Sequence, residues 1–429
     1  MEENTVPDLN KKRSKSQKLG PPAKKNKLEQ TDENSFYNYK TNKNEYSLLD
    51  FSDDVLLEIL KNLNTGDLIN LGQSCTRLEQ LIRDRTLWGN VDLRTSDING
   101  SSLKDYVNYL LPNTKSFAVK GCEAAIINQN VARRLYNEPE GNERVNTSGI
   151  HRPVNENVQA ELLLENLNGA TLQRDVVENI CKIAPNIEEF IVENHFIDGL
   201  ELLLEHFPSN LIHLSLKDCC VYRLPDNKSY FFGFHEKFPK IECLDLTNCL
   251  WYTCHSFFAL SKSKTLKKLI LYGCSQIYNC VPYISLAFRI GFNSLTSLDL
   301  RRTMISDREL GCLNNSSLME LYLEKPPDIR QARLQVTDLG ITSLGNNVQH
   351  RVGYDNVIVV AVRGSAAPPP PLQKLVVIGY DKVTDRSLAH IQKSLLQVTY
   401  LDISGTGCTR KGVRNFKKNR PQATVVSNY

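Results

Sequence analysis

The sequence lacks any long apolar run. A span across a bilayer needs about 18 consecutive apolar residues, and the longest runs here, such as Val357–Val362, have only the length of a strand. No apolar stretch follows residues 1–4, so we expect no secretory signal and no membrane partner. The twelve cysteines are then expected to be free thiols in a reducing compartment rather than a disulfide framework.

The sequence also lacks a large excess of one charge. Its formal net charge is +4, from 52 Lys and Arg and 48 Asp and Glu. Ten of these basic residues and seven of the acidic ones lie in residues 1–45, which leaves 42 and 41 for the rest. The rest of the chain is nearly neutral, which argues against a large surface for phosphate backbones, so we expect no nucleic-acid partner.

Motifs of the common enzyme classes are missing as well. There is no P-loop and no G-x-S-x-G motif, and the eight histidines are scattered. Cys249, Cys254 and His255, or Cys274 and Cys280, invite a zinc site, but their spacing is irregular and a structural site needs four convergent ligands. No cysteine lies in a motif that carries a base. We therefore expect no metal, no cofactor, no catalytic residue and no enzymatic activity.

Residues 1–45 are rich in Lys, Asn, Ser, Glu and Gln, which predicts a disordered basic tail. Within this tail, residues 11–27 contain eight basic residues and no acidic one. Their two clusters resemble a bipartite nuclear-import signal, which implies a protein of nucleus and cytoplasm; the alternative is a solvated polybasic tail. The candidate import residues are Lys11, Lys12, Arg13, Lys24, Lys25 and Lys27.

Residues 46–93 have the pattern of two or three short helices. Apolar residues at positions 55, 56, 59, 60 and 63 have helical spacing, and Ser52 or Asp53 can cap the helix that they form. A break at residues 65–67 precedes a second helical pattern, and Leu87-Trp88 closes the segment. So short a segment forms only a small core, which gains stability by packing on a neighbour.

From about residue 110 the chain repeats the template L-x-x-L-x-L-x-x-C/N/T. One copy is Leu211, Leu214, Leu216 and Cys219. Copies between Ile187 and Leu318 start 24, 30, 25, 29 and 23 residues apart, which is typical of leucine-rich repeats. Positions four and six point inward from a strand, and a helix returns on the other side. We therefore predict an α/β fold, in which a short all-helical segment precedes a curved solenoid over residues 94–429, with parallel strands concave and helices convex.

Two stretches interrupt this period. Residues 123–158 are polar and are expected to form an insertion. Residues 346–371 end in Pro368–Pro371, which cannot pair in a sheet. We expect a surface loop at residues 346–371, although Val357–Val362 could form an extra strand, and a lid or docking loop is the functional alternative.

Residues 47–93 resemble an F-box. The segment reads LLDFSDDVLLEIL over residues 48–60, and Leu68, Leu71, Cys75 and Leu87-Trp88 follow. Joined to repeats of the cysteine type, this segment is similar to the F-box/LRR-repeat family, and LWGNVDL at residues 87–93 resembles its number-twelve type. The chain departs from the family pattern at Phe51-Ser52, where Leu-Pro is usual, and at Ser74 and Leu78.

The resemblance implies the substrate-recognition subunit of an SCF-type cullin–RING ubiquitin ligase. In that family the F-box binds a Skp-type adaptor, which carries a cullin and a RING subunit, and the repeats hold a protein substrate. The departures at Phe51-Ser52 imply weaker adaptor binding. The residues carried over to the adaptor contact are Phe51, Ser52, Leu56, Ile59, Leu60, Leu63, Leu68, Leu71, Leu78 and Trp88. Part of this apolar set must instead hold the helices together.

Positions three, five and seven of each repeat are expected to line the concave face. They mix tyrosine and arginine, which are common interface anchors, with charges of both signs. This mixture favours a protein ligand, although a solvated strand position is the alternative for any single residue. The candidate substrate residues are Lys217, Asp245, Lys268, Tyr272, Asp299, Arg301, Tyr322 and Tyr400.

Two other functions remain open. The chain could be a leucine-rich-repeat scaffold or inhibitor whose helical segment only caps the array, or a nuclear RNA-associated protein that uses its basic tail. A basic run also follows the last repeat, at Arg410, Lys411, Arg414, Lys417, Lys418 and Arg420. We expect this run to be the polar terminal cap that a solenoid needs.

Overall fold

The computed structural model describes residues 47–98, 102–121, 171–224, 229–315, 317–327, 335–345, 348–352, 357–361 and 371–429. The predicted basic tail with its import residues and the predicted insertion at 123–158 lie outside the described residues. The chain divides into two compact units, residues 1–50 and 51–429. In the first unit the structure describes a short 3₁₀ helix, η1 (Leu48–Asp50), whose side chains are exposed.

The second unit begins with three short helices. They are α1 (Asp53–Leu60), α2 (Thr65–Gly72) and α3 (Thr76–Leu81), followed by the 3₁₀ helix η2 (Arg85–Leu87). Ser52 stands at the N-cap of α1 but its hydroxyl makes no capping bond, whereas Asn64 caps α2 by accepting from the Asp67 N–H at 2.9 Å. The predicted helices are therefore present, but residues 65–67, where the sequence predicts a break, are the first turn of α2.

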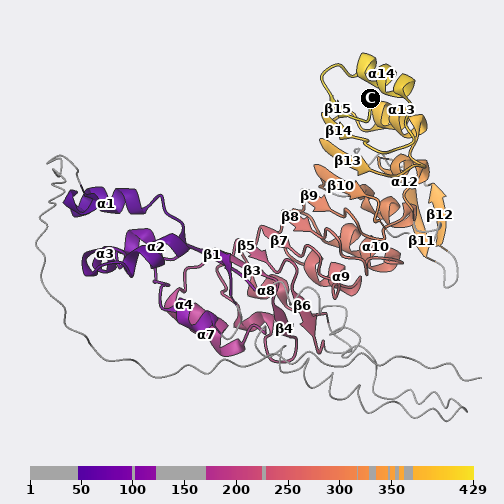
Figure 1. Ribbon diagram of the computed structural model, residues 1–429. Helices are drawn as coiled ribbons and strands as arrows, with labels where there is room; N and C mark the ends of the chain where they lie inside the picture. Colours follow the sequence, from indigo (N-terminus) through magenta and orange to yellow (C-terminus); the bar gives the residue numbers. More distant parts are fainter. Residues whose placement is uncertain are drawn as a thin grey trace, which may run out of the picture. The chain divides into compact units, whose positions relative to one another are not determined.

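The repeats form one parallel sheet of eleven strands among the described residues (Figure 1). In spatial order the strands are β1 (Asn90–Asp97), β2 (Ser116–Lys120), β3 (Glu189–Glu193), β5 (His213–Ser215), β7 (Cys243–Asp245), β8 (Lys268–Ile270), β9 (Ser297–Asp299), β10 (Glu320–Glu324), β13 (Lys374–Ile378), β14 (Tyr400–Asp402) and β15 (Thr424–Val426). Strands β2 and β3 pair directly, and so do β10 and β13, although long segments separate them in the sequence. The ladder therefore keeps its register on either side of both segments.

The repeat template explains each strand. Leu214 and Leu216 are fully buried, and the next Cys lies inside the turn, where the Cys219 thiol donates to the Val192 carbonyl at 3.2 Å. The residue before that cysteine adopts a left-handed conformation, as at Asp218 and Asn248, both with φ of 57°. This turn sends the chain away from the sheet and into the return segment of each repeat.

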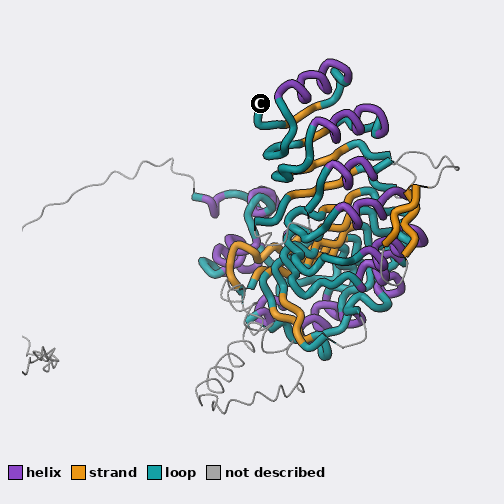
Figure 2. Tube along the Cα trace, turned by 90° about the vertical axis from the view of Figure 1, so that its right-hand side faces the viewer, coloured by secondary structure: helices purple, strands orange, loops and turns teal. Residues whose placement is uncertain are grey.

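The return segments include helices on one side of the sheet (Figure 1, Figure 2). Their bounds are α4 (Leu103–Val107), α7 (Arg174–Ile183), η3 (Leu204–His206), α8 (Phe234–Lys237), α9 (His255–Ser261), α10 (Val281–Ile290), α11 (Asp307–Leu310), η4 (Gly311–Asn315), α12 (Asp338–Ser343), α13 (Asp385–Ser394) and α14 (Arg410–Asn419). One continuous apolar core runs under them, from Leu60 of the helical segment to Ala423 before the last strand. The helical segment and the repeats thus share their core, as its small size required.

A ladder of aspartates joins the last helices to one another. The Thr337 hydroxyl donates to Asp307 at 2.7 Å, the Thr384 hydroxyl to Asp338 at 2.6 Å, and the Thr409 hydroxyl to Asp385 at 2.6 Å. In each case the threonine is the N-cap of one helix and the aspartate belongs to the first turn of the helix before it. The ladder therefore aligns the helix starts of successive repeats.

Two predictions about these segments need correction. The loop expected at residues 346–371 contains an antiparallel pair, β11 (Val348–Val352) with β12 (Val357–Ala361), so the alternative of an extra strand is what the structure shows. The expectation that all cysteines are free is wrong for Cys254 and Cys280, which form a disulfide. These two residues are the N-cap residues of the neighbouring helices α9 and α10, which brings their Cα atoms to 5.4 Å. Nine other cysteines in the described ranges are free.

A further short sheet lies on the return side, where β4 (Phe196–Asp198) pairs in parallel with β6 (Cys220–Tyr222). Among the described residues, no helix is long and apolar enough to span a membrane.

Candidate protein-binding surfaces

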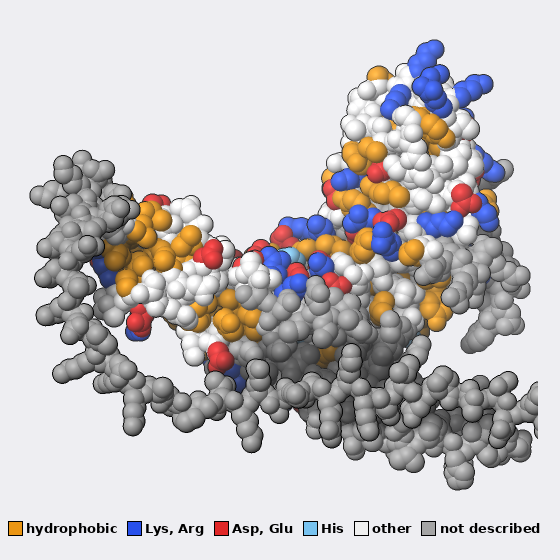
Figure 3. Space-filling view, viewed as in Figure 1, with side chains coloured by type: hydrophobic (Ala, Val, Ile, Leu, Met, Phe, Trp, Pro, Cys, Tyr) orange, Lys and Arg blue, Asp and Glu red, His pale blue; other side chains and the backbone are white. Residues whose placement is uncertain are grey.

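The first candidate surface is the exposed side of α1, which we call the α1 face and define by Phe51, Val55 and Ile59. Val55 and Ile59 are four residues apart and so lie on one side of the helix, and Phe51 stands just before the N-cap residue Ser52. They are 45%, 43% and 39% exposed, whereas Leu56 and Leu60, on the other side, are 1% exposed. Figure 3 shows hydrophobic side chains at the surface where Figure 1 places α1–α3. The α1 face is thus an apolar stripe that nothing in the described chain covers.

Arg77 of α3 holds this helix in place. Its guanidinium donates to the Phe51 carbonyl at 2.8 Å and to Asp53 Oδ1 at 2.6 Å. Leu56 and Leu60 complete the attachment from the buried side. The α1 face is therefore presented by a helix that is anchored at its start and along its inner side.

The structure divides the predicted adaptor residues into three groups. Phe51, Ser52 and Ile59 are exposed, Leu63 and Leu71 are half-buried, and Leu56, Leu60, Leu68, Leu78 and Trp88 are buried. The buried members hold the helical segment together and cannot touch a partner while it stays folded. Val55, absent from the predicted set, is exposed between Phe51 and Ile59. Val55 could have been identified from the sequence, because it is an apolar residue four positions from both Phe51 and Ile59.

Trp88 shows what the buried members do. Its indole N–H donates to the Ile82 carbonyl, and its ring stacks on Tyr109 of the first repeat with ring centroids 5.0 Å apart. A groove of about 730 Å³ lies beside this contact, lined by α2, α3 and the chain after α4. The two charged side chains that line this groove, Glu79 and Arg83, pair with each other at 2.6 Å.

The second candidate surface consists of the side chains at repeat positions three, five and seven, which we call the sheet face. Parallel pairing puts equivalent positions side by side, as in the row Lys268, Ser297, Glu320, Lys374 and Tyr400. Figure 3 shows Lys and Arg interspersed with Asp and Glu over this part of the molecule. The sheet face is therefore polar and mixed in charge, unlike the α1 face.

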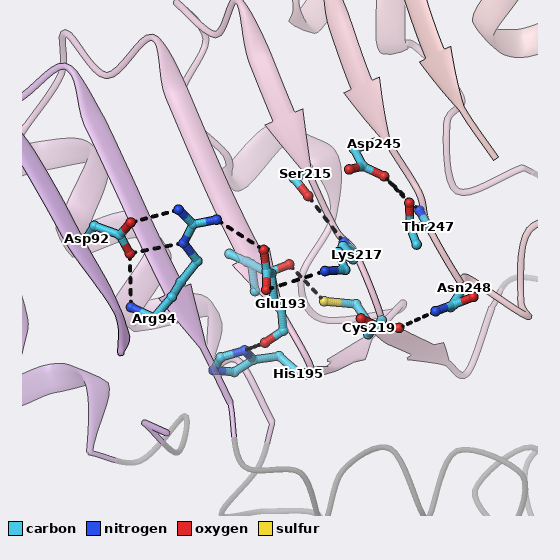
Figure 4. A network of polar contacts seen from close by, with 12 residues as sticks. Asp92, Arg94, Glu193, His195, Ser215, Lys217, Cys219, Asp245, Thr247 and Asn248 are labelled. Carbon is cyan, nitrogen blue, oxygen red and sulfur yellow. Dashed lines mark hydrogen bonds and ion pairs between the residues drawn. The ribbon is translucent and has the colours of Figure 1, made fainter. Parts of the chain in front are cut away.

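A charged network crosses the first strands of the sheet face (Figure 4). Arg94 pairs with Asp92 at 2.7 Å and with Glu193 at 3.3 Å, and Lys217 Nζ lies 4.0 Å from Glu193. The hydrogen bonds from Arg94 hold the pKa of Asp92 below its usual range, and those to Asp92 and Glu193 raise the pKa of Arg94. This network brings together residues 99 apart in the sequence.

Tyrosines and cations alternate over the later strands. The Arg301 guanidinium carbon lies 5.2 Å from the ring centroid of Tyr272 and 5.5 Å from that of Tyr322, while Asp299 binds Arg301 at 2.6 Å. Lys374 Nζ lies 5.1 Å from the Tyr322 ring centroid and 4.9 Å from that of Tyr400. Burial and the hydrogen bond to Glu320 raise the pKa of Tyr322 to about 12, so its hydroxyl is a donor at neutral pH.

The structure brings some of the predicted substrate residues into contact and leaves others apart. Tyr272, Asp299, Arg301 and Tyr322 form one cluster, and Tyr400 joins it through Lys374. Asp245 is bound by its own neighbour Thr247, and Lys268 is exposed. Asp299 is only 6% exposed, so it positions Arg301 more than it meets solvent. Sequence reasoning missed Lys374, although it stands at position three of the repeat that begins at Leu372.

The cysteines of this region offer no reactive thiolate at neutral pH. Burial raises the pKa of Cys243 to about 11 and raises those of Cys219, Cys249 and Cys274 further. A thiol with such a pKa stays protonated and is a poor nucleophile. In the part of the chain that the structure describes, no group of three His, Cys, Asp or Glu side chains could hold a metal ion.

Comparison with known proteins adds a domain assignment for the helical segment. Residues 48–90 match the F-box domain. No curated protein matches the chain, so its resemblance to the number-twelve type stays a prediction. Similar solved structures include a leucine-rich-repeat protein of Leptospira interrogans, 14% identical with a TM-score of 0.36, over 59% of this chain and 51% of that one. An internalin of Listeria monocytogenes is 15% identical with a TM-score of 0.29, over 58% of this chain and 70% of that one. The chain therefore carries an F-box domain, and a leucine-rich-repeat array follows it.

Proposed function

We propose that this chain is the substrate-recognition subunit of an SCF-type cullin–RING E3 ubiquitin ligase. The F-box binds the Skp-type adaptor, which links the chain to a cullin and a RING subunit, and the repeats bind a protein substrate. The chain itself performs no bond chemistry and is not an enzyme; it supplies proximity between the substrate and the ubiquitin-loaded enzyme.

The observation that carries this proposal is the α1 face within the F-box match. Val55 and Ile59 on α1, and Phe51 just before its N-cap, are 39–45% exposed, while Leu56 and Leu60 on the inner side of the helix are buried. An exposed apolar stripe on an anchored helix is typical of a surface that a partner covers. The Skp-type adaptor is the partner that an F-box implies.

The departure at Phe51-Ser52 has a physical consequence for this contact. Ser52 makes no capping bond, so the start of α1 lacks both the usual proline and a capping side chain. Arg77 compensates by binding the Phe51 carbonyl and Asp53. We expect adaptor binding to survive but to be weaker than with the usual Leu-Pro.

The decisive experiment is co-purification of the full chain with a Skp-type adaptor. The test variant is the double substitution Val55→Asp, Ile59→Asp, since both side chains are exposed and the fold should tolerate the change. Substitution of Leu56 and Leu60 would be a poor test because both are buried and their loss would unfold the helix. The matched control is Leu339→Asp, Leu396→Asp, two side chains of the repeats that are 63% and 64% exposed.

The outcome separates the leading function from its alternative. We expect the natural chain and the control to retain the adaptor and the test variant to lose it. If the natural chain itself brings down no adaptor, the ligase role is wrong and the chain is a leucine-rich-repeat scaffold or inhibitor. A circular dichroism spectrum of each variant confirms that the fold is intact.

We also propose that residues 11–27 direct import into the nucleus. The support is the pair of basic clusters without an acidic residue. Replacement of Lys24, Lys25 and Lys27 by Ala should move a fluorescently tagged chain to the cytoplasm. An unchanged distribution would contradict an import signal and leave a solvated basic tail.

A further inference from the structure

The acidic side chains of the later sheet face already have partners. Asp299 pairs with Arg301 at 2.6 Å, and Glu324 pairs with Arg302 at 2.8 Å. Glu320 accepts hydrogen bonds from the Ser297 hydroxyl at 2.9 Å and the Tyr322 hydroxyl at 3.0 Å. Asp402 is bound in the same way by Ser404. Each of these four acidic side chains thus has at least one partner inside the molecule.

Several donors on the same surface have no such partner. Within the described residues, the Lys268 and Lys374 ammonium groups make no ion pair, and the hydroxyls of Tyr272 and Tyr400 make no hydrogen bond. Lys268 is exposed, and Lys374 lies half-buried between the rings of Tyr322 and Tyr400. A half-buried cation flanked by rings is less hydrated than one in open solvent, which strengthens its attraction for an anion.

The presence of paired acidic side chains beside unpaired donors indicates what kind of ligand this surface can bind. A surface whose acidic side chains already have partners, and whose two lysines and two tyrosine hydroxyls do not, complements a ligand rich in anionic acceptors. We propose that the sheet face over β8–β14 binds an extended acidic segment of a protein, whose carboxylates reach Lys268 and Lys374 and whose other side chains pack on the tyrosine rings. That this protein is the substrate of a ubiquitin ligase rests on the proposed function.

The register of the sheet sets the spacing of the two carboxylates. Lys268 and Lys374 occupy the same row, separated by Ser297 of β9 and Glu320 of β10. Three strand-to-strand steps of about 4.8 Å span roughly 14 Å, and an extended chain advances about 3.3 Å per residue. The two acids should therefore stand about four residues apart, and this even spacing also points both to the same side of the extended peptide.

A second group of free cations provides the sharpest competing explanation. Arg410, Lys411, Arg414, Lys417 and Lys418 of α14 are exposed and pair with no acid of the described chain. They would attract an anion through charge alone. In the part of the chain that the structure describes, this group has no adjacent tyrosine rings like those of the sheet face, so it should not favour one spacing of the acidic residues in a peptide. Substitutions in α14 therefore serve as the matched control for those in the sheet face.

The experiment measures fluorescence anisotropy of labelled twelve-residue peptides with the full chain. The peptides share a serine and leucine background and carry Glu at positions five and nine, Glu at five and eight, Gln at five and nine, or phosphoserine at five and nine. We expect the first peptide to bind at least tenfold more tightly than the second and third. The Lys268→Gln, Lys374→Gln variant should lose that tenfold preference, and the Lys411→Gln, Lys418→Gln variant should keep it.

Four results would overturn the inference: equal binding of the Glu and Gln peptides, no effect of the Lys268 and Lys374 changes, loss of binding through the α14 changes instead, or binding of the phosphoserine peptide alone.

Adaptor co-purification from the same preparations separates this inference from the proposed function. A chain that holds the adaptor but no acidic peptide contradicts only the inference. A chain that prefers the acidic peptide but holds no adaptor supports the inference and contradicts the ligase role.

Discussion

The two candidate surfaces differ in how much of their chemistry is already satisfied within the chain. The α1 face is apolar and bare, with the side chains of Phe51, Val55 and Ile59 at the surface. The sheet face is polar and largely paired, since Arg301 is held by Asp299 between two tyrosine rings. A bare apolar stripe gains free energy by burial against almost any complementary apolar surface, so its affinity depends on area and fit.

A paired polar surface behaves differently. Its internal ion pairs fix the positions of the side chains before a ligand arrives, so less conformational entropy is lost on binding. Only groups that remain free, such as Lys268 and Lys374, can add new polar contacts. The α1 face therefore suits a constant partner that every complex shares, and the sheet face suits a ligand that must be discriminated.

The largest expected effect comes from Trp88→Ala, which should unfold the helices that carry the α1 face and leave the sheet face folded. Trp88 is 3% exposed, stacks on Tyr109 and bonds the Ile82 carbonyl. Its truncation should lower the free energy of unfolding by about 3–5 kcal/mol, measured by denaturant titration. Hydrogen exchange should show lost protection in α1–α3 and retained protection in β7–β14. Uniform loss across the chain would mean that the two regions do not separate energetically.

The second effect concerns the aspartate ladder that supports the sheet face from the helix side. Asp338 accepts from Thr384, Ser387 and their backbone amides. Burial alone raises the pKa of Asp338, but the hydrogen bonds from Ser387 and Thr384 outweigh it and hold the pKa below the usual 3.8. We expect Asp338→Ala to cost about 1–3 kcal/mol in stability at neutral pH, measured by denaturant titration.

The lowered pKa of Asp338 also predicts that the stability of the fold depends on pH. A group whose pKa is depressed in the folded state stabilises it above the unfolded-state pKa, and that stability is lost as the pH falls through the folded-state pKa. The stability difference between the natural chain and Asp338→Ala should therefore be full at pH 7 and shrink below pH 3.8. A difference that stays constant down to pH 3 would show that Asp338 acts through packing alone.

Much of this architecture could be predicted from the sequence because its causes are local. The repeat template places Leu214 and Leu216 inside and Cys219 in the turn, and helical spacing locates α1. The template also puts Tyr272 and Arg301 on the sheet face, where the structure finds them in contact. A period of two or of 3.6 residues is written into neighbouring positions, so it needs no knowledge of distant contacts.

What the sequence could not show depends on contacts between distant residues. Helical spacing marks Leu56 and Ile59 alike as apolar, and only the packing of α3 decides that the first is buried and the second exposed. Thr384 and Asp338 are 46 residues apart, and no short motif announces their bond. Cys254 and Cys280 meet only because α9 and α10 start side by side.

Salt should weaken binding to the sheet face several-fold more than it weakens binding to the α1 face. Ionic attraction of a peptide to Lys268 and Lys374 is screened as the Debye length falls from about 10 Å at 0.1 M salt to about 3 Å at 1 M. Binding of the acidic peptide should therefore weaken several-fold over this range, while adaptor binding through Val55 and Ile59 should hold or strengthen. Titrations at both salt concentrations test this, and equal salt sensitivity of the two would contradict the contrast between a charged and an apolar surface.

The smallest expected effect tests the contrast between paired and bare side chains directly. Arg301→Ala leaves the buried Asp299 without its guanidinium, but the Arg301 side chain is 35% exposed, so solvent screens the loss. We expect it to cost about 0.5–1 kcal/mol of stability. Phe51→Ala, at a side chain 45% exposed, should change stability by less than about 0.5 kcal/mol and still weaken adaptor binding. If Phe51→Ala destabilised the chain more than Arg301→Ala, the α1 face would be part of the fold rather than a surface reserved for a partner.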